Sequence, residues 1–523
     1  MEIKLFKDIS REDIGQIFSM KAKVTTVKQT SGPTLMIMTD GTANFTFKAF
    51  VKPGVRAYPE VDVGDIVLVK AKINERKDTI EGEVSSMEKL GESEKEDYEN
   101  KIQEMNEEKF KPINTNFSIQ SEVLESLKPR FIKIATLIRK AIVEGRPILL
   151  RHDADCDGYS SAICMERAIT EFMMEVTGGD KQVLFQNYRR APSKAPFYEY
   201  EDAVKDCSNW LRDKNRAGLS PPLIIVTDNG STQEDYLGMT QMKIYDADIV
   251  VIDHHYPGEL DEKGKVFIDR VLSGHINPYL TGYDSNVCSG MLGYEMARFI
   301  YEKNSNSIFI PAMAGILDHT EGPEKDKYIE LAEKEGFTVD YMTKLGEITY
   351  LQSHYLRFME AREFVNDLFG ANMKLQKELV KMLSPEIEKR YEKVKKIAKH
   401  YSEVIDIGAF YIVHFDGEKG TARGEFPAVG KSTNQVHKMF EEELDKPIIT
   451  MTSGSTFLTI RVSDAIKGFS VPDFCEIINK EIPHTAAEGG GHEHAGSVKF
   501  VEYGRDEVIE AFKNYLKDIA KKQ

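Results

Sequence analysis

The sequence predicts a multidomain α/β protein, in which a parallel-sheet domain and a smaller α/β domain are joined by helices and preceded by a β-barrel. Residues 1–90 contain five short strands separated by glycine turns, a pattern typical of small barrels. From Pro147 onward, continuous apolar runs alternate with helical segments, as in a parallel sheet covered on both faces. We expect the following segments: a barrel at 1–90, a charged linker and helix at 91–145, a parallel-sheet domain at 146–322, a helical connector at 323–405 and an α/β domain at 406–523.

Composition excludes several classes of protein. Of the 523 residues, 69 are Lys or Arg and 85 are Asp or Glu, which gives a net charge of −16. This charge excludes a polybasic coat, so contact with nucleic acid needs local patches or bound cations. No apolar stretch approaches the ~18 residues of a membrane span, and the N-terminus has no apolar segment of a signal peptide. The five cysteines form no CxxC pair, so we expect a reduced, cytoplasmic protein. The charged composition and the lack of a span lead us to expect no membrane partner.

The expected barrel strands lie at 17–28, 35–38, 45–50, 65–69 and 80–84. Residues 63–71, Val-Gly-Asp-Ile-Val-Leu-Val-Lys-Ala, resemble the passage from the third to the fourth strand of OB-folds. An unrelated barrel that contacts a protein is the alternative. Phe45, Phe47 and Phe50 are candidates for stacking on bases, and their ordinary role would be in the barrel core.

The rest of the chain follows helical and strand patterns in turn. A charged stretch from residue 91 precedes a helical pattern at 123–142, in which Pro129 is a possible kink and Gly145 a C-cap. Apolar strands are expected at 148–150, 182–185, 223–226 and 248–252. In the last domain we expect strands at 410–413, 447–451 and 456–462, and a final helix at 506–519.

Acidic and imidazole side chains follow the ends of four expected buried strands. The four segments are Arg-His-Asp-Ala-Asp-Cys-Asp-Gly at 151–158, Thr-Asp-Asn-Gly at 227–230, Asp-His-His-Tyr-Pro-Gly at 253–258 and Asp-His at 318–319. Alone, each Asp could cap a helix and each His could be structural. Together, four or five carboxylates without a cation would cost several kcal/mol in repulsion. Mixed carboxylate and imidazole ligands suit Mn²⁺, and a metal pair would also supply a hydroxide nucleophile.

The order of these motifs resembles the DHH phosphoesterase superfamily, whose name motif is present as Asp253-His254-His255. Within the superfamily, the chain is similar to RecJ-like single-strand-specific exonucleases of the archaeal type with an N-terminal OB-fold. Asn277-Pro278 and Cys288-Ser289-Gly290 also match the RecJ layout. The glycine- and histidine-rich residues 489–496 resemble the motif of the DHH-associated domain. The resemblance covers residues 146–523.

This resemblance implies a role for each residue of the motifs. Two Mn²⁺ ions, or Mg²⁺, would be held by Asp153, Asp155, Asp228, His254 and Asp318, with Asp228 as the bridging carboxylate. Of the two catalytic candidates, Asp157 would orient the first motif or its water, and His255 would face the phosphate as an electrophile or as a further ligand. Asp253 would orient the histidines. Many archaeal relatives have His in place of Asp153, so the role of the neighbouring His152 stays open.

The substrate-binding candidates lie in two regions. In the last domain they are Arg461, Ser463, Gly489, Gly490, Gly491 and His492, which would hold a phosphate through backbone amides, a guanidinium and an imidazole. Arg189 and Arg190 follow the expected second strand of the sheet and would hold the scissile strand, with ordinary surface charge as the alternative.

These features together predict a hydrolase that degrades single-stranded DNA or RNA from an end, in replication, repair or RNA turnover. An oligoribonuclease or cyclic-dinucleotide phosphodiesterase is the first alternative, and a catalytic or scaffold subunit is the second. The resemblance to archaeal relatives suggests GINS of the replisome or an RNase J-like protein as partners, with the 323–405 helices as docking surface. DNA versus RNA and the direction of cleavage stay open.

Overall fold

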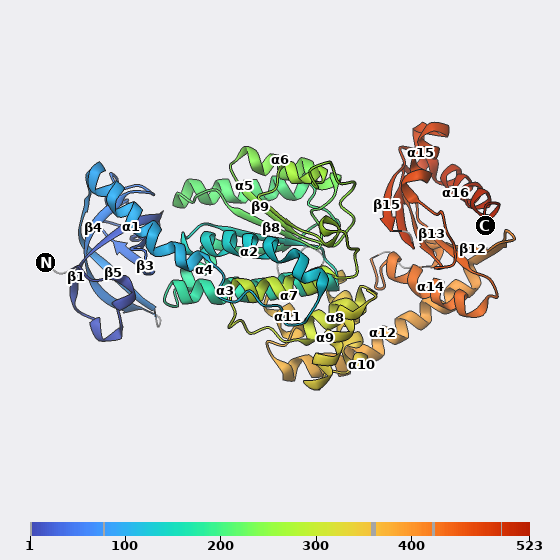
Figure 1. Cartoon of the computed structure of the whole chain (residues 1–523), viewed down its shortest axis with the longest axis horizontal. Coiled ribbons are helices and arrows are strands. Elements are labelled where there is room, and N and C mark those ends of the chain that lie inside the picture. The colour runs from blue at the N-terminus through green and yellow to red at the C-terminus, as the bar shows by residue number, and fades with distance from the viewer. Residues whose placement is uncertain (1–2, 77–78, 357–361, 421–423, 493) are drawn as a thin grey trace. The chain divides into compact units, whose positions relative to one another are not determined.

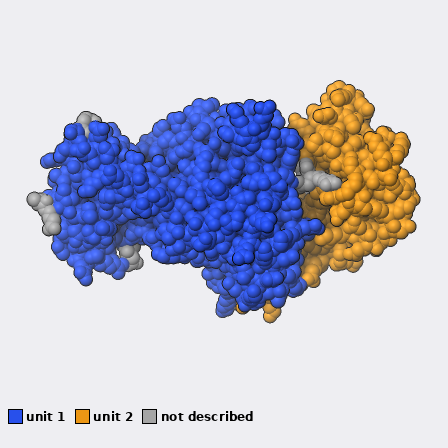
Figure 2. All heavy atoms as spheres, in the orientation of Figure 1, with its two compact units in different colours: residues 1–376 blue, residues 377–523 orange. Residues whose placement is uncertain are grey.

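The computed structural model describes residues 3–76, 79–356, 362–420, 424–492 and 494–523. The chain divides into two compact units, residues 1–376 and residues 377–523 (Figure 2). The first unit contains the barrel, the parallel sheet and most of the connecting helices (Figure 1). The second contains a mixed sheet with its own core.

The N-terminal strands close into a barrel in the order β1-β2-β3-β5-β4, which confirms the predicted barrel. The strands are β1 Ile17–Gln29, β2 Thr34–Thr39, β3 Asn44–Ala49, β4 Ile66–Arg76 and β5 Thr79–Lys89. Alternate side chains of β1 and β4 point into the core, as the period of two predicts. At Gly82 an added Cβ would lie 2.5 Å from Phe47 Cδ1, so the core leaves no room there for a side chain.

The three phenylalanines of the barrel occupy different environments. Phe47 is fully buried, and its ring centroid lies 5.3 Å from that of the partly buried Phe45. Phe50 follows β3 and is 60% exposed. Of the three candidates, Phe50 is therefore the one whose ring is open to a base.

Two helices connect the barrel to the parallel sheet: α1 Glu92–Phe110 and α2 Glu122–Val143. The charged segment is thus mostly helical, and it packs on the barrel. Lys23 pairs with Glu99 at 2.8 Å, and the Tyr98 hydroxyl donates to the carbonyl of Lys21 at 2.5 Å. The α2 helix buries the predicted apolar face and contains Pro129.

The central sheet is wholly parallel, with the order β10-β9-β8-β6-β7. Its strands are β6 Ile148–His152, β7 Tyr188–Pro192, β8 Leu223–Thr227, β9 Asp248–Ile252 and β10 Gly274–Ile276. The helices of this domain are α3 Cys156–Val176, α4 Lys181–Asn187, α5 Tyr200–Ala217, α6 Tyr236–Ile244, α7 Ser289–Ile300 and α8 Phe309–Leu317. Figure 1 shows α5 and α6 on one face of the sheet and α2, α3 and α7 on the other. The predicted parallel sheet is confirmed.

Two strand predictions were wrong. Residues 182–185 lie in helix α4, and the strand begins three residues later, at Tyr188. Asp318 follows helix α8, not a strand. Both segments are short apolar runs, and α8 is buried on nearly every side, so neither run carries a period that separates helix from strand.

The remaining helices of the connector are α9 Pro323–Lys334, α10 Val339–Leu356, α11 Arg362–Leu368 and α12 Met373–Tyr401. The second unit has a six-stranded sheet in the order β11-β12-β13-β14-β16-β15. Its strands are β11 Ser402–Asp406, β12 Tyr411–Asp416, β13 Ile448–Ser453, β14 Phe457–Val462, β15 Glu488–His492 and β16 Ala495–Lys499. Its helices are α13 Gly417–Gly420, α14 Val429–Glu443, α15 Val471–Glu481 and α16 Arg505–Ala520. The β12–β13 pair is parallel and the other pairs are antiparallel.

Within the described ranges, the chain has no helix with the length and apolar character needed to cross a bilayer.

The two barrel phenylalanines should respond differently to substitution. Phe47→Ala should lower the free energy of unfolding by about 3–5 kcal/mol, because it leaves a cavity in a packed core. Phe50→Ala should change it by less than about 0.5 kcal/mol, because the ring is exposed. Denaturant titration of both variants measures the difference, and equal losses would contradict the barrel core described here.

Candidate metal centre

The carboxyl ends of three neighbouring strands bring the acidic motifs together. In the parallel register, His152 of β6 lies beside Thr227 of β8, and Thr227 lies beside Ile252 of β9. The residue that follows each strand is an aspartate: Asp153, Asp228 and Asp253. Because parallel strands end at the same edge, three sequence-distant carboxylates converge there, as expected for such sheets.

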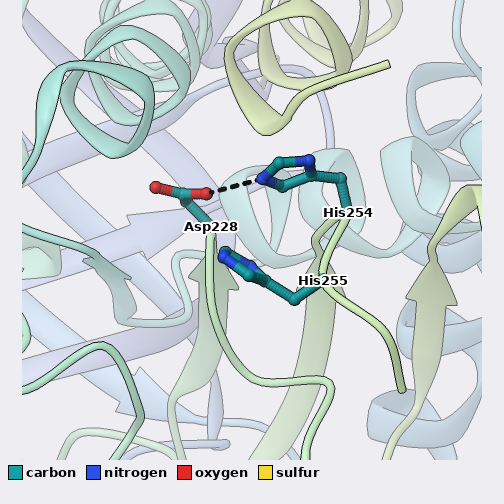
Figure 3. A group of neighbouring side chains, drawn as sticks. All are labelled: Asp228, His254 and His255. Carbon is teal, nitrogen blue, oxygen red and sulfur yellow. Dashed lines mark ion pairs between the residues drawn. The ribbon is translucent and has the colours of Figure 1, made fainter. Parts of the chain in front are cut away.

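The converging side chains form three groups whose ligating atoms lie within 4.8 Å of one another. The groups share members, so they form one continuous cluster. They are Asp228–His254–His255, Asp157–His254–Asp318 and Asp153–Asp155–Asp228. Figure 3 shows the first group, with both imidazole rings extending toward Asp228. Every residue that the sequence predicted as a metal ligand is therefore in one cluster.

The first motif is shaped by the start of helix α3. Asp155 is the N-cap, and its Oδ1 accepts the amide of Gly158 at 2.9 Å. Asp153 turns back to accept the amide of Ala154 at 2.7 Å. An added Cβ at Gly158 would lie 2.4 Å from the carbonyl oxygen of Asp153, so glycine lets the loop and the helix approach each other.

Asp228 occupies the centre of the cluster and has an unusual backbone. Its φ is 58°, in the left-handed region, where Asp is among the more tolerated residues. Its amide donates to the Ile252 carbonyl at 3.0 Å, and its side chain is almost fully buried. Such strain persists where surrounding contacts hold it, and it is typical of functional sites.

The two histidines are held by different partners. His254 Nδ1 lies 2.9 Å from the Ser285 carbonyl, so Nδ1 carries the proton, and Nε2 is left facing Asp228 Oδ1 at 3.5 Å. His255 Nδ1 donates to Asp253 Oδ1 at 2.8 Å. Asp253 also accepts the amides of Ser231 and His254, at 3.2 and 2.8 Å. Asp253 thus orients the His255 ring and fixes the backbone at His254, whose ring is held by Ser285.

These contacts shift the pKa values of both histidines. Burial lowers the pKa of His254, and the neighbouring His255 lowers it further, so the ring is a neutral ligand. Burial also opposes protonation of His255, but pairing with Asp253 outweighs it and raises the pKa of His255 to about 10. His255 therefore presents a positive charge beside Asp228 when no metal is bound.

Asp157 uses both carboxylate oxygens within the protein. Oδ2 accepts the amide of Ser289 and Oδ1 the amide of Gly290, both at 2.8 Å. These amides belong to the first turn of helix α7, whose N-cap Cys288 offers no side-chain acceptor. The charge of Asp157 is thereby balanced by the helix N-terminus, which gives it an orienting role.

Asp318 completes the cluster from the end of helix α8, with Oδ2 3.8 Å from His254 Nδ1. One nearby residue was missed by sequence reasoning. Tyr350 of α10 lies close enough to Asp155 and Asp318 for their charges to raise the pKa of its hydroxyl, in addition to the effect of burial. No motif marks Tyr350, because it lies in a helix that is remote in sequence.

The carboxylates of the cluster resist ionisation together. Burial raises the pKa of Asp153 to about 7, and the charge of Asp155 adds to this effect. The pKa values of Asp155, Asp228 and Asp318 are also raised, first by burial and then by neighbouring carboxylates. A divalent cation removes this repulsion, and oxygen donors with one or two imidazoles fit a hard or borderline ion. The residues present therefore fit the metal pair that the sequence predicted.

Comparison with known proteins identifies the family. Residues 147–317 match the DHH family, N-terminal domain, and residues 18–90 match the OB-fold nucleic acid binding domain. An uncharacterized protein of Methanocaldococcus jannaschii is 37% identical over an alignment 544 residues long. The alignment covers 99% of this chain and 71% of that protein. The chain belongs to the DHH family.

Solved structures share the fold. The DHH domain of a member of a family of ribosomal proteins is 34% identical, with a TM-score of 0.78 over 82% of this chain and 99% of that one. RecJ from Thermus thermophilus, in complex with Mn²⁺, has a TM-score of 0.51 at 14% identity, over 80% of this chain and 57% of RecJ. At this identity, the likeness to RecJ shows a shared fold.

The two arginines of the DHH domain are not positioned as the sequence suggested. Arg190 is 3% exposed, and its Nε donates to Glu166 at 2.9 Å. Its Nη1 lies 3.2 Å from His152 Nε2, and His152 Nδ1 donates to the Asp153 carbonyl at 2.6 Å. Arg190 and His152 therefore support the backbone of the first motif. Arg189 lies near the start of β7, at the edge opposite the cluster.

In the second unit, the predicted phosphate-binding residues are largely engaged within the protein. Arg461 donates to Asn434 and to the Ile460 carbonyl, and the Ser463 hydroxyl donates to Glu441. Gly489, Gly490 and Gly491 form an extended edge strand, β15, not a turn. An edge strand leaves one row of backbone amides outside the sheet. The His492 side chain lies outside the described part, so a phosphate-binding role for this group stays a prediction.

Removing the central charge of the DHH cluster should stabilise the metal-free protein. The raised pKa of Asp228 means that folding disfavours its ionised form, so at neutral pH the charge costs stability. Asp228→Asn should raise the melting temperature in EDTA by about 2–4 °C for each kcal/mol of unfavourable free energy that is removed with the charge. Mn²⁺ should then stabilise the wild type but not the variant. Calorimetry with and without Mn²⁺ measures both effects, and an unchanged response to Mn²⁺ would contradict the ligand assignment.

Removing the charge of Asp157 should destabilise the metal-free protein, the opposite of the effect expected for Asp228→Asn. Asp157→Asn replaces one acceptor by an NH₂ group that faces a backbone amide of α7. We expect the free energy of unfolding to fall by about 1–3 kcal/mol, the cost of an unmade buried hydrogen bond. The same calorimetry in EDTA, with Asp228→Asn as the matched control, separates orienting from ligating carboxylates. Stabilisation by Asp157→Asn would refute the helix-capping role.

Proposed function

We propose that this protein is a metal-dependent phosphodiesterase that removes nucleotides from an end of single-stranded DNA or RNA. The observation that carries the proposal is the continuous cluster of ligand groups, which shares Asp228 and His254 at the edge of the parallel sheet. Such a cluster is expensive to build without a cation, and DHH-family membership connects it with phosphoester chemistry.

The chain's own residues divide the chemical work. Asp228, with Asp153, Asp155, His254 and Asp318, would hold a pair of metal ions. When bound, such a pair supplies a hydroxide nucleophile at neutral pH and stabilises charge on the leaving oxygen. The His255 ring, oriented by Asp253, lies beside the cluster and would bind the negatively charged phosphate. Tyr350 offers a neutral hydroxyl at the side of Asp155 and Asp318.

The donor set favours Mn²⁺, with Mg²⁺ as the alternative. Oxygen donors outnumber imidazole nitrogens, and no thiolate is among the grouped ligands of the described residues. Cys156 is adjacent in sequence but fully buried. RecJ from Thermus thermophilus, whose fold this chain shares, was crystallised with Mn²⁺.

A single-stranded substrate is supported by the N-terminal barrel. The barrel matches an OB-fold nucleic acid binding domain, and Phe50 supplies an exposed ring next to β3. In such barrels, stacked bases and local cations hold a strand without reading its sequence. Because the chain as a whole is acidic, binding depends on such local features.

End-labelled strands test the proposal. With Mn²⁺, the wild type should shorten a 30-nucleotide single strand from one end, which labels at the 5′ and 3′ ends of DNA and RNA identify. Asp228→Asn should lose at least ~100-fold in rate, equivalent to ~3 kcal/mol of transition-state stabilisation. Glu262→Gln, which neutralises an exposed carboxylate of the same domain, is the matched control.

Three outcomes would refute the proposal. Cleavage that survives Asp228→Asn would remove the metal cluster from the chemistry. Cleavage restricted to dinucleotides or cyclic dinucleotides would assign the smaller substrate class. If Zn²⁺ restores cleavage to the EDTA-treated protein and Mn²⁺ does not, the assignment of Mn²⁺ as the bound ion is wrong.

A further inference from the structure

A cavity lies at the amino-terminal edge of the parallel sheet, opposite the metal centre. It has a volume of about 260 Å³, and its walls include the first residues of β6 and β7, the end of α4 and one side of α5. With ~3.3 Å per strand residue, β6 separates the cavity from Asp153 by roughly 16 Å. It is therefore distinct from the cluster described above.

The charge around this cavity differs from that of the whole chain. Four cations line it: Lys28, Arg189, Arg212 and Arg216. Two carboxylates also line it, but Asp206 is already bound by Arg151 in a two-point contact at 2.5 and 2.9 Å. Asp213 lies 3.7 Å from Arg189 and 3.2 Å from Arg212. The cavity is thus locally positive in a protein of charge −16, which favours an anionic ligand.

Aromatic rings stand at the mouth and in the wall of the cavity. Phe185 of α4 is 88% exposed, although it is a large apolar side chain. Trp210 of α5 is buried in the wall, with its indole N–H donating to the Ser220 carbonyl at 3.0 Å. An exposed ring beside cations is the combination on which single-stranded bases stack.

Two buried polar atoms in the lining have no partner among the described residues. They are Gln186 Nε2 and Asn187 Oδ1, a donor and an acceptor on adjacent residues. Asn187 is only 2% exposed, and its Nδ2 already donates to the Gly145 carbonyl at 2.9 Å. Buried polar atoms are rarely left unpaired in folded proteins. A ligand with its own donor and acceptor would complete both, as the edge of a nucleobase does.

We propose that this cavity binds one nucleotide of a single-stranded nucleic acid. The base stacks on Phe185 and meets Gln186 and Asn187 at its edge. The flanking phosphates lie near Arg212 and Arg216 on α5 and Lys28 on β1. The volume is slightly below the ~300–1,000 Å³ of typical small-molecule sites, so one unit of a longer strand fits better than a whole free ligand.

This inference rests on the nucleic-acid substrate proposed above but not on cleavage, because it concerns binding alone. Nucleic acid is favoured over an acidic peptide by the exposed ring and by the unpaired acceptor Asn187 Oδ1, to which an ionised carboxylate side chain has no proton to donate. The cavity would hold a strand far from the metal centre. A dinucleotide is too short to occupy both places, so the cavity should matter for long strands only.

Binding to the full-length protein in EDTA tests the proposal without cleavage. The probes are fluorescein-labelled oligo(dT) and oligo(U) of 20 nucleotides, measured by anisotropy. Phe185→Ala should raise Kd by about 5- to 100-fold, the range of one lost base stack. Arg212→Ala with Arg216→Ala should reduce the slope of log K against log salt by about 1.4, or ~0.7 for each phosphate contact. Cleavage of a dinucleotide should be unchanged in all these variants.

The controls match each variant in kind. Tyr503→Ala removes a 94% exposed ring of the second unit, and Lys133→Ala with Lys334→Ala removes two exposed cations elsewhere in the first. Melting temperatures show that the variants fold. If Phe185→Ala binds both probes within twofold of wild type, the proposal is wrong. It is also wrong if labelled poly-glutamate depends on the arginine pair while the oligonucleotides do not, since the cavity would then bind acidic peptides.

A protein that binds as expected but does not cleave would refute the proposed function and leave this inference standing. If the wild type cleaves but Phe185→Ala leaves binding unchanged, the proposed function stands and this inference is wrong.

Discussion

Repulsion among buried carboxylates is the constraint on which the DHH domain depends. Asp153, Asp155, Asp228 and Asp318 all have raised pKa values, because burial and their neighbours both disfavour ionisation. A parallel sheet gathers these groups at one place, since every strand ends at the same edge. Without a cation the cluster therefore lowers the stability of the fold, and the residues around it limit that cost.

Two devices limit the repulsion without occupying the centre. Asp157 directs its charge to the N-terminus of α7 through two amides, and Gly290 leaves room for that contact because an added Cβ would lie 2.8 Å from Asp157 Oδ1. Asp253 is compensated by His255 and by backbone amides, which hold its pKa below the usual range although burial alone would raise it. Both aspartates orient their neighbours, and the remaining carboxylates are the proposed metal ligands.

The two edges of the same sheet carry opposite character. The carboxyl edge concentrates acids and imidazoles, whereas the amino edge has arginines, an exposed ring and unpaired amide atoms. The proposed nucleic-acid substrate would require this division, because repulsion over the rest of an acidic surface leaves only local sites for binding an anionic polymer. In the proposed function, the exposed Phe50 of the barrel would be a third such site.

The sequence by itself determined the barrel, the parallel sheet and the identity of the clustered acids, because each depends on short-range patterns: alternation, apolar runs and an acidic residue after each strand. Only the tertiary structure decided which residues lie beside those acids. Residues 182–185 and 309–317 are helices, and their short apolar runs carry no period that distinguishes a helix from a strand. Packing brought Tyr350 to the cluster and turned Arg190 inward to Glu166, and neither contact leaves a local signal in the sequence.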